Sequence, residues 1–215
     1  MVMFADRIAA GEVLADKFFS TKPKFSDPVV LGIPRGGLPI GHCIAQKLGA
    51  PLDTVVLRKL PIPDNPESGF GAVTSDKSVI FNKSILSYLA LDDSEIKKIV
   101  DDVHIEVLRR EAIYRRGRPF PELQERSVIL TDDGLATGIT MLAAVRFVRA
   151  RRPKEIIVAV PVAHHEAYNV IRQEADKVFT LHISDLPYFA VASFYVEFPD
   201  MEDQEVIFYL DQYYK

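Results

Sequence analysis

Residues 127–140 read SVILTDDGLATGIT, and this stretch decides the fold. It begins with an apolar run over 127–131 that does not alternate with polar residues, which is typical of a strand buried on both faces of a parallel sheet. Two acids and a short loop follow, and a helix is expected to start at Thr137-Gly138. In open α/β sheets such a loop lies beyond the carboxyl end of its strand, where ligands bind.

The same type of pattern extends over most of the chain. Four further apolar runs predict strands over residues 29–32, 54–57, 155–160 and 177–181. Helical patterns cover about 5–19 and 36–48, and the longest helix is expected to start near Asp92, where Glu95 completes a capping signal. Strands that alternate with helices predict an α/β fold with an open, mainly parallel five-stranded sheet flanked by helices, in one domain over 1–215.

Two segments depart from this alternation. Residues 59–83 contain three prolines, two glycines and a predicted hairpin around Ser75-Asp76, so we expect a hood or flap beside the sheet. Residues about 183–215 form an aromatic and acidic C-terminal segment that is expected to pack over the sheet edge or a partner subunit. A basic cluster that includes Arg109, Arg110 and Arg115 is interpreted as a solvated helix end, because a helix C-terminus favours cations.

Composition excludes several classes of protein. The 215 residues carry a net charge of −4 without a long basic run, which argues against a dedicated nucleic-acid binder. A single cysteine, Cys43, rules out an intrachain disulfide and favours the reducing cytoplasm. The chain has no apolar window long enough for a membrane span, so we expect neither a membrane nor nucleic acid as a partner.

The loop after residues 127–131 carries the chemistry. A helix N-terminus favours a phosphate, and the predicted seat for it comprises Ala136, Thr137, Gly138, Ile139 and Thr140. The adjacent acids Asp132 and Asp133 repel each other unless hydroxyl donors or a cation such as Mg²⁺ satisfy them. Together these groups predict a ribose 5-phosphate site; the alternative is an acidic turn that only caps the helix.

Residues 127–140 closely resemble the signature of type I phosphoribosyltransferases, which bind 5-phosphoribosyl 1-pyrophosphate (PRPP). Residues 4–11 (FADRIAAG) and 65–72 (NPESGFGA) resemble a bacterial and archaeal subgroup of that family over most of the chain. The resemblance implies the type I phosphoribosyltransferase fold, Mg²⁺ as cofactor, PRPP and a nucleobase as substrates, and a homodimer in nucleotide salvage. It also implies that Asp132 and Asp133 bind the ribose and the metal ion.

The resemblance implies a pyrophosphate site as well. It assigns the pyrophosphate to Arg35, Gly36 and Gly37, where glycine amides can form an anion nest and a non-proline cis peptide often occurs. Lys59, which is expected to follow the second strand, is preferred to Arg58 as a further pyrophosphate ligand. The alternatives are an ordinary glycine turn for residues 35–37 and a solvated basic pair at the strand end.

The acceptor is less well specified. Glu67 is a candidate for base binding or general base catalysis, or it is a solvated loop carboxylate. His164, His165 and Phe189 are candidates for the base pocket, although the two histidines also fit an exposed helix start. Enzymes of this family that act on 6-oxopurines have an aspartate where this chain has Ala136, which disfavours their base mechanism here.

Two alternative functions remain open from the sequence. One is a non-catalytic sensor of PRPP or a nucleotide on the same fold, and the other is a nucleoside or nucleotide phosphorylase whose anion seats hold free phosphate. A complete pyrophosphate loop together with Lys59 and the flap favours the transferase.

Overall fold

The central element of the fold is a five-stranded sheet with strand order β2-β1-β6-β7-β8, in which all neighbouring strands are parallel. The computed structural model describes residues 3–21, 23–63 and 65–214, and for residues 65–68 it describes the backbone alone. The predicted open parallel sheet of five strands is confirmed. Its strands are β1 (Val29–Gly32), β2 (Leu52–Thr54), β6 (Ser127–Thr131), β7 (Glu155–His164) and β8 (Lys177–Ser184).

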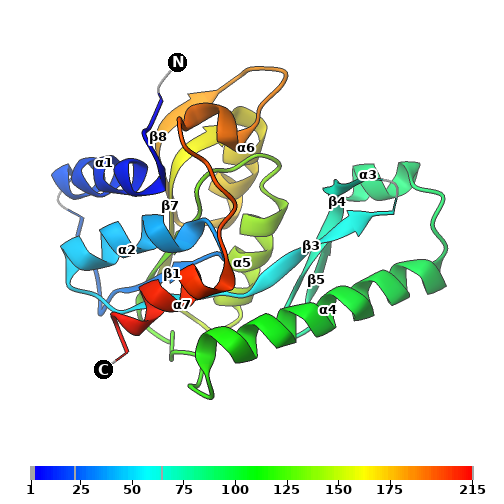
Figure 1. The fold of residues 1–215 in the computed structure, drawn as a ribbon, viewed down its shortest axis with the longest axis horizontal. Coiled ribbons are helices and arrows are strands. Elements are labelled where there is room, and N and C mark those ends of the chain that lie inside the picture. Colours follow the sequence, from blue (N-terminus) through cyan, green and yellow to red (C-terminus); the bar gives the residue numbers. More distant parts are fainter. Residues whose placement is uncertain (1–2, 22, 64, 215) are drawn as a thin grey trace.

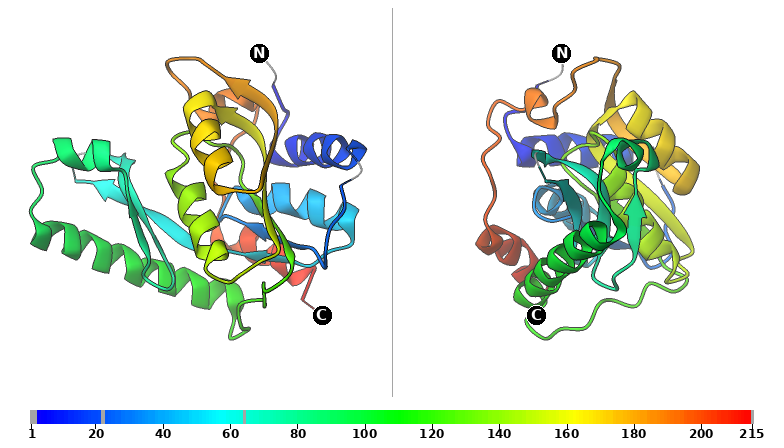
Figure 2. Two further views of the ribbon diagram at one scale, coloured as in Figure 1. Left: turned by 180° about the vertical axis from the view of Figure 1, so that it is seen from behind. Right: turned by 90° about the vertical axis from the view of Figure 1, so that its right-hand side faces the viewer.

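Helices cover both faces of this sheet (Figures 1 and 2). One face carries α1 (Arg7–Ser20) and α2 (Gly37–Leu48), and the other carries α5 (Ile139–Arg149) and α6 (His165–Glu174). In β1, Val30 belongs to the hydrophobic cluster on the first face, whereas Val29 and Leu31 belong to the cluster on the second. Because both faces are buried, the strands are apolar throughout.

The second strand is shifted from its predicted place. The apolar run 54–57 was expected to be a sheet strand, but β2 ends at Thr54, and Val55 donates its N–H to the Gly32 carbonyl as the chain leaves the sheet. Val55 and Val56 are buried on the way to a second sheet, whose first strand begins at Leu57. Their burial without a strand ladder produces the same apolar run as a strand. β7 and β8 also continue beyond their predicted ends.

Much of the predicted flap is a separate antiparallel sheet that extends from the main sheet along a long helix (Figure 1). The elements are β3 (Leu57–Ile62), β4 (Asn65–Thr74), β5 (Val79–Phe81), α3 (Lys83–Tyr88) and α4 (Asp93–Arg115). The hairpin expected around Ser75-Asp76 joins β4 to β5, and Thr74 donates its hydroxyl to Asp76 at 2.6 Å. α4 starts as predicted, with Asp92 and Glu95 forming a capping box.

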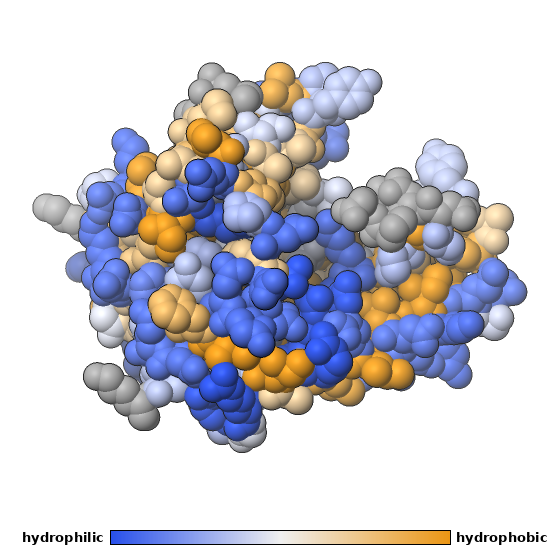
Figure 3. All heavy atoms as spheres, viewed as in Figure 1, coloured by the Kyte–Doolittle hydropathy of each residue, from blue (hydrophilic) through white to orange (hydrophobic). Residues whose placement is uncertain are grey.

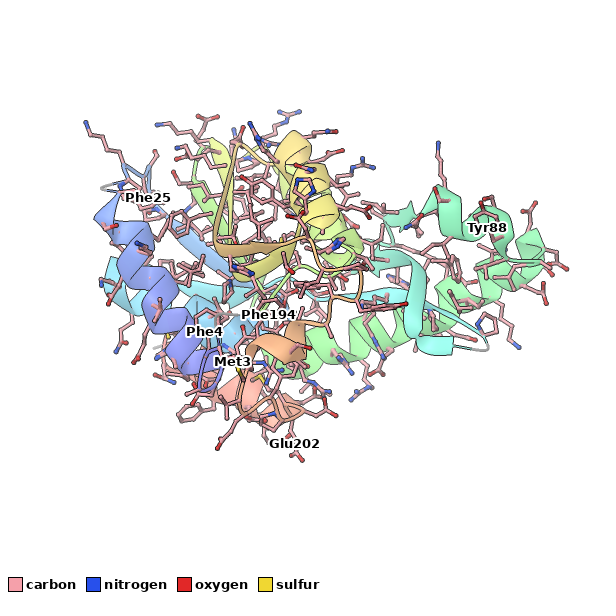
Figure 4. All side chains as sticks on the ribbon, turned by 90° about the horizontal axis from the view of Figure 1, so that it is seen from above. Met3, Phe4, Phe25, Tyr88, Phe194 and Glu202 are labelled. Carbon is pink, nitrogen blue, oxygen red and sulfur yellow. The ribbon has the colours of Figure 1, made fainter. Side chains whose placement is uncertain are left out.

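The C-terminal segment returns to the N-terminus of the chain. It contains η1 (Val191–Phe194) and α7 (Asp203–Asp211), and α7 packs on α2 and α4 of the same chain. Phe4 donates its N–H to the Phe194 carbonyl at 2.8 Å, and the two residues lie together (Figure 4). Within the described ranges, no helix has both the length and the apolar character that a membrane span requires.

Candidate active site

The loops that follow β1 and β6 lie side by side, because these strands are neighbours in the sheet. Ile33 donates its N–H to the Thr131 carbonyl at 2.9 Å, and the Thr131 hydroxyl donates to the Gly37 carbonyl at 2.9 Å. A Cβ atom on Gly37 would lie 3.2 Å from Asp132 Cα and closer still to the Thr131 carbonyl oxygen. Glycine at this position therefore allows the two loops to approach each other closely.

Asp132 lies between two cavities, one of about 610 Å³ and one of about 150 Å³. Its Oδ1 accepts the N–H of Asp133 at 2.9 Å, and the described side chains give it no ion pair. Burial raises the pKa of the Asp132 carboxyl, and the charge of Asp133 raises it further, while Lys59 acts in the opposite direction. This oriented, uncompensated carboxylate is suited to hydroxyl groups or a cation.

Asp133 has a different environment from its neighbour. Its Oδ2 accepts a hydrogen bond from Arg7 Nε at 2.8 Å, and the side chains of Arg7 and Asp133 are only 10% and 16% exposed. Tyr195 donates its hydroxyl to the Asp133 carbonyl at 2.6 Å. Burial raises the pKa of Asp133, and the hydrogen bond from Arg7 lowers it. The two acids that the sequence predicts to act together are therefore unequal, and Asp133 already has a cationic partner.

The predicted phosphate seat is the turn into α5, formed by Ala136, Thr137, Gly138, Ile139 and Thr140. Gly138 is the N-cap of α5 with a φ of 75°, a conformation that favours glycine, and it has no side chain to occupy the amides of the first turn. Leu135 donates its N–H to the Val162 carbonyl at 2.9 Å, which ties the turn to β7. Thr140 lines both cavities. This arrangement is suited to an anion.

Of the predicted pyrophosphate residues, Lys59 lines the larger cavity, whereas Arg35, Gly36 and Gly37 belong to the loop after β1, of which Ile33 and Pro34 line that cavity. The Pro34–Arg35 peptide bond is cis, and Arg35 Nη1 lies 3.9 Å from Asp203 Oδ1. Lys59 lines both cavities, as Asp132 does, but it lies inside β3 of the antiparallel sheet and does not follow a strand of the main sheet. Gly36 joins Arg35 to α2 and faces Asp133. The two loops and the antiparallel sheet thus bring a lysine and an acid to one cavity boundary.

Two arginines that the sequence analysis did not assign to the site, Arg58 and Arg110, line the larger cavity. Glu106 on α4 forms ion pairs with Arg109 at 2.7 Å, Arg110 at 3.0 Å and Arg58 at 3.5 Å. These interactions, with Arg109 the strongest, lower the pKa of Glu106 to about 2. The larger cavity is lined by three basic and three acidic side chains, and hydrophilic side chains gather between α7 and the antiparallel sheet (Figure 3). Nothing in the local sequence brings Arg58 to α4, so this cluster is a product of the fold.

The remaining predicted residues differ in whether they line a third cavity. His164 and Phe189 line a third cavity of about 410 Å³ that Thr137 also lines, and their ring centroids are 5.6 Å apart. His165 is 53% exposed in its side chain and lies 3.4 Å from Asp185, so the structure does not bring it into that cavity. Glu67 belongs to the backbone of β4, and its side chain lies outside the described part of the structure.

Comparison with known proteins identifies the family. A family model described as "phosphoribosyl transferase domain" matches residues 5–197. Two Mycobacterium tuberculosis proteins, from strains CDC 1551 / Oshkosh and H37Rv, carry the name "putative phosphoribosyl transferase" and are each 36% identical to this chain over 99% of it. The chain spans 47% of the length of these curated relatives. The crystal structure of the protein TT1426 from Thermus thermophilus is 34% identical, with a TM-score of 0.80 and coverage of 99% of each chain.

The chain belongs to the phosphoribosyl transferase domain family. The match covers nearly all the elements described above, including both loops and the antiparallel sheet. The resemblance seen in residues 127–140 is thereby confirmed, as is the type I phosphoribosyltransferase fold.

These residues could coordinate Mg²⁺ only together with the phosphate oxygens of a bound ligand. Among the described residues, no group of three or more His, Cys, Asp or Glu side chains is arranged to hold a metal ion. Asp132 is a free carboxylate beside Thr140 and Lys59, whereas Arg7 already binds Asp133. Mg²⁺ commonly binds through one or two carboxylates, several waters and the phosphates of a substrate. A phosphoribosyl transferase domain with one free acid is consistent with that mode of binding.

Proposed function

We propose that this protein transfers the 5-phosphoribosyl group of PRPP to a nitrogenous base, or a related nitrogen nucleophile, and releases pyrophosphate. The observation that carries the proposal is the position of Asp132 between the turn into α5 on one side and the larger cavity on the other, where Arg58, Lys59 and Arg110 offer cationic groups. PRPP has the same order of groups, with a 5-phosphate, a ribose diol and a 1-pyrophosphate. Membership of the phosphoribosyl transferase domain family supports the same reaction.

Each group of PRPP has candidate ligands in this order. The amides and hydroxyls of residues 136–140 would hold the 5-phosphate, and the binding energy gained there would fix the reacting end of the sugar. The Asp132 carboxylate would accept hydrogen bonds from the ribose hydroxyls. Lys59, which lines the larger cavity, would receive the pyrophosphate together with Arg35 and the amides of Gly36 and Gly37, which follow Ile33 and Pro34 of the same cavity lining.

The chemical step needs positioning and charge stabilisation. The bond from the anomeric carbon to the pyrophosphate oxygen breaks, the bonding electrons leave with pyrophosphate, and the acceptor nitrogen forms the new bond. Lys59 and Arg35 would stabilise the negative charge that develops on the leaving group. Mg²⁺, when bound with PRPP, supplies further neutralisation of this charge beside Asp132.

The third cavity is the best candidate for the acceptor base. Phe189 offers an aromatic face, and the His164 ring lies 5.6 Å from it. Ala136, which also lines this cavity, has no group that could take a proton from an acceptor. The mechanism of 6-oxopurine enzymes is therefore disfavoured, and an acceptor that enters as a neutral base with an available nitrogen is favoured. Glu67 stays a candidate general base on the flap.

The setting of the reaction is a further part of the proposal. The single cysteine supports activity in the reducing cytoplasm. The family supports a role in nucleotide salvage, with PRPP and a nucleobase as partners. The family resemblance supports a homodimer. The net charge of −4 supports a small-molecule substrate bound by a few local cationic groups and not nucleic acid held over a wide surface.

The test combines binding with turnover. Pyrophosphate release is measured with PRPP, Mg²⁺ and a panel of purine and pyrimidine bases, and PRPP binding is measured by calorimetry. Asp132→Asn should abolish measurable Mg-PRPP binding without loss of thermal stability, because it removes a desolvated charge. Asp101→Asn on α4, which removes an exposed partner of Lys77, is the control and should bind PRPP as the unmodified chain does.

Three results would contradict the proposal in different ways. Unchanged PRPP affinity in Asp132→Asn would defeat the assignment of the ribose site. Tight PRPP binding without pyrophosphate release for any base would favour a sensor. Consumption of free phosphate with a nucleoside or nucleotide, in place of pyrophosphate with a nucleotide, would favour a phosphorylase.

A further inference from the structure

The C-terminal helix α7 links the loop after β1 to the long helix α4. It packs between α2 and α4 (Figure 1), and its residues Val206 and Leu210 are fully buried. The family model matches residues 5–197, so α7 (Asp203–Asp211) lies beyond the matched part of the chain. The contacts that α7 makes with the candidate active site are therefore not accounted for by the family match.

Asp203, in the first turn of α7, contacts three side chains. Its Oδ1 accepts the hydroxyl of Tyr114 at 2.5 Å and lies 3.9 Å from Arg35 Nη1, while its Oδ2 lies 3.7 Å from Arg109 Nη2. Tyr114 belongs to α4 and is fully buried, and burial together with this hydrogen bond raises its pKa, so the phenol remains a donor. The Asp203 carboxylate is thus fixed by Tyr114, and the two arginines approach it as cations.

Two acids share four arginines beside the larger cavity. Asp203 attracts Arg35 and Arg109, and Arg109 also pairs with Glu106 at 2.7 Å. Glu106 pairs in addition with the two arginines that line the larger cavity, Arg58 and Arg110. Burial lowers the pKa of Arg58, and the charges of the other three arginines lower it further. Arg35 is therefore close enough to the larger cavity for its charge to act there.

The side chain of Arg35 is turned toward α7. Ile33 and Pro34 of the same loop line the larger cavity, whereas Arg35 is not among the described residues that line either cavity beside Asp132. The side chains of Arg35 and Asp203 are 34% and 22% exposed, and an ion pair that is partly solvated is broken at small cost. Two anions at one guanidinium repel each other, so a pyrophosphate group competes with Asp203 for Arg35.

We propose that Asp203 is a positioning residue that acts through Arg35, as an internal counter-ion that holds the guanidinium and yields it to the pyrophosphate group. This inference rests on the proposed function and deepens it. The counter-ion lowers the affinity for pyrophosphate and so favours its release after transfer. Loss of the Asp203 charge should then strengthen pyrophosphate binding, whereas loss of a merely structural contact would weaken it or leave it unchanged.

The experiment compares two aspartates of the same helix in the full chain. Asp203→Asn removes the charge but keeps an acceptor for the Tyr114 hydroxyl, and Asp203→Glu keeps the charge. Asp211→Asn is the matched control, because it removes the same charge and an ion pair with Arg116 at 3.2 Å. At about 1.5 Å per residue, Asp211 lies about 12 Å along the helix from Asp203, beyond the Debye length of about 8 Å at physiological salt.

Three measurements are made on each variant. Calorimetry gives the dissociation constant of Mg-pyrophosphate, steady-state kinetics gives the inhibition of turnover by pyrophosphate, and urea unfolding checks the fold. Arg109→Gln, alone and combined with Asp203→Asn, separates the two cations that Asp203 contacts.

The expected change is modest, because the ion pair is partly exposed. We expect Asp203→Asn to bind Mg-pyrophosphate roughly two- to fivefold more tightly than the unmodified chain, and pyrophosphate to inhibit turnover at correspondingly lower concentration. Asp211→Asn and Asp203→Glu should both lack this gain. The gain should persist when Asp203→Asn is compared with its parent in the Arg109→Gln background, since the effect acts through Arg35.

Two outcomes overturn the inference. One is a folded Asp203→Asn variant that binds Mg-pyrophosphate no more tightly than Asp211→Asn. The other is a gain that disappears in the Arg109→Gln background, since the effect would then act through Arg109. Failure of the proposed function looks different: the unmodified chain would release no pyrophosphate with any base, while calorimetry would still compare the variants. If the unmodified chain also bound no Mg-pyrophosphate, the inference would fall with the function on which it rests.

Discussion

The replacement Gly36→Ala tests the site through one methyl group. In the structure the new Cβ would lie 2.5 Å from Asp133 Cγ, whereas carbon atoms in good contact are about 3.5 Å apart. The Asp133 carboxylate would then have to move by about 1 Å, and its 2.8 Å hydrogen bond from Arg7 would lengthen to roughly 3.8 Å, beyond the range of a hydrogen bond.

Two measurable losses follow from this displacement. Overpacking of a well-filled site costs about 1–3 kcal/mol, which for a chain of this size lowers the melting temperature by roughly 2–12 °C. The released Asp133 adds negative charge to the anion site, so we expect the dissociation constant of Mg-PRPP to rise by about tenfold, equal to about 1.4 kcal/mol. Circular dichroism melting and calorimetry measure the two losses on the same preparation.

Gly49→Ala is the matched control for this prediction. Nothing lies within 4 Å of a Cβ atom at Gly49, but its φ of 65° is strained for alanine, at a cost of about 1 kcal/mol. The control should therefore lose comparable stability and keep its affinity for PRPP. If Gly36→Ala bound PRPP as tightly as Gly49→Ala does, the argument from the Arg7–Asp133 contact would be refuted.

Three other perturbations test separate parts of the structure. Arg115→Met leaves Asp53 as an unpaired buried acid, since the side chains of Arg115 and Asp53 are only 6% and 7% exposed. We expect the free energy of unfolding measured in urea to fall by about 3–5 kcal/mol, and a fall below about 1 kcal/mol would contradict the buried pair. Glu106→Gln removes the counter-ion of Arg58 and Arg110 at the larger cavity, so calorimetry should show pyrophosphate binding severalfold more tightly, and weaker binding would argue against an anion site there. Burial raises the pKa of Cys43 from 9.0 to about 11, so the thiol should resist iodoacetamide at about pH 8 in the folded chain. Because the thiol of the unfolded chain ionises first, the contribution of Cys43 to the free energy of unfolding should be lost as pH rises from 9.0 to about 11. A Cys43→Ala variant with an equally steep loss of stability over that range would contradict this assignment.

The main sheet and its ligand-binding loop could be predicted because their signals are local. The apolar run, the two acids and the helix start of 127–140 follow each other in sequence, and the structure keeps them in that order as β6, a turn and α5. The capping box of Asp92 and Glu95 is similarly local, so the start of α4 was predicted correctly. Burial misled the prediction at Val55 and Val56, because residues that cross between two sheets are as apolar as a strand.

The partners of the acids could not be predicted, because they come from distant parts of the chain. Arg7 is separated from Asp133 by 126 positions, and the packing of α1 on α2 and on the main sheet brings them together. The expectation of a solvated basic helix end was wrong for Arg115, which pairs with the buried Asp53 of β2. Charge patterns along one helix show which residues are basic, but not which of them the fold encloses.

These long-range contacts explain how the site can contain two adjacent acids and still suit a polyanion. If both carboxylates were free, they would raise each other's pKa and oppose the negative ligand. The fold places a cation, Arg7, on one acid and leaves the other beside Lys59. Because Gly36 lies against this same ion pair, the contact between Arg7 and Asp133 also packs the loop after β1 against the loop after β6. Charge balance and loop spacing are therefore coupled, and a change in either should be detected as a change in PRPP affinity.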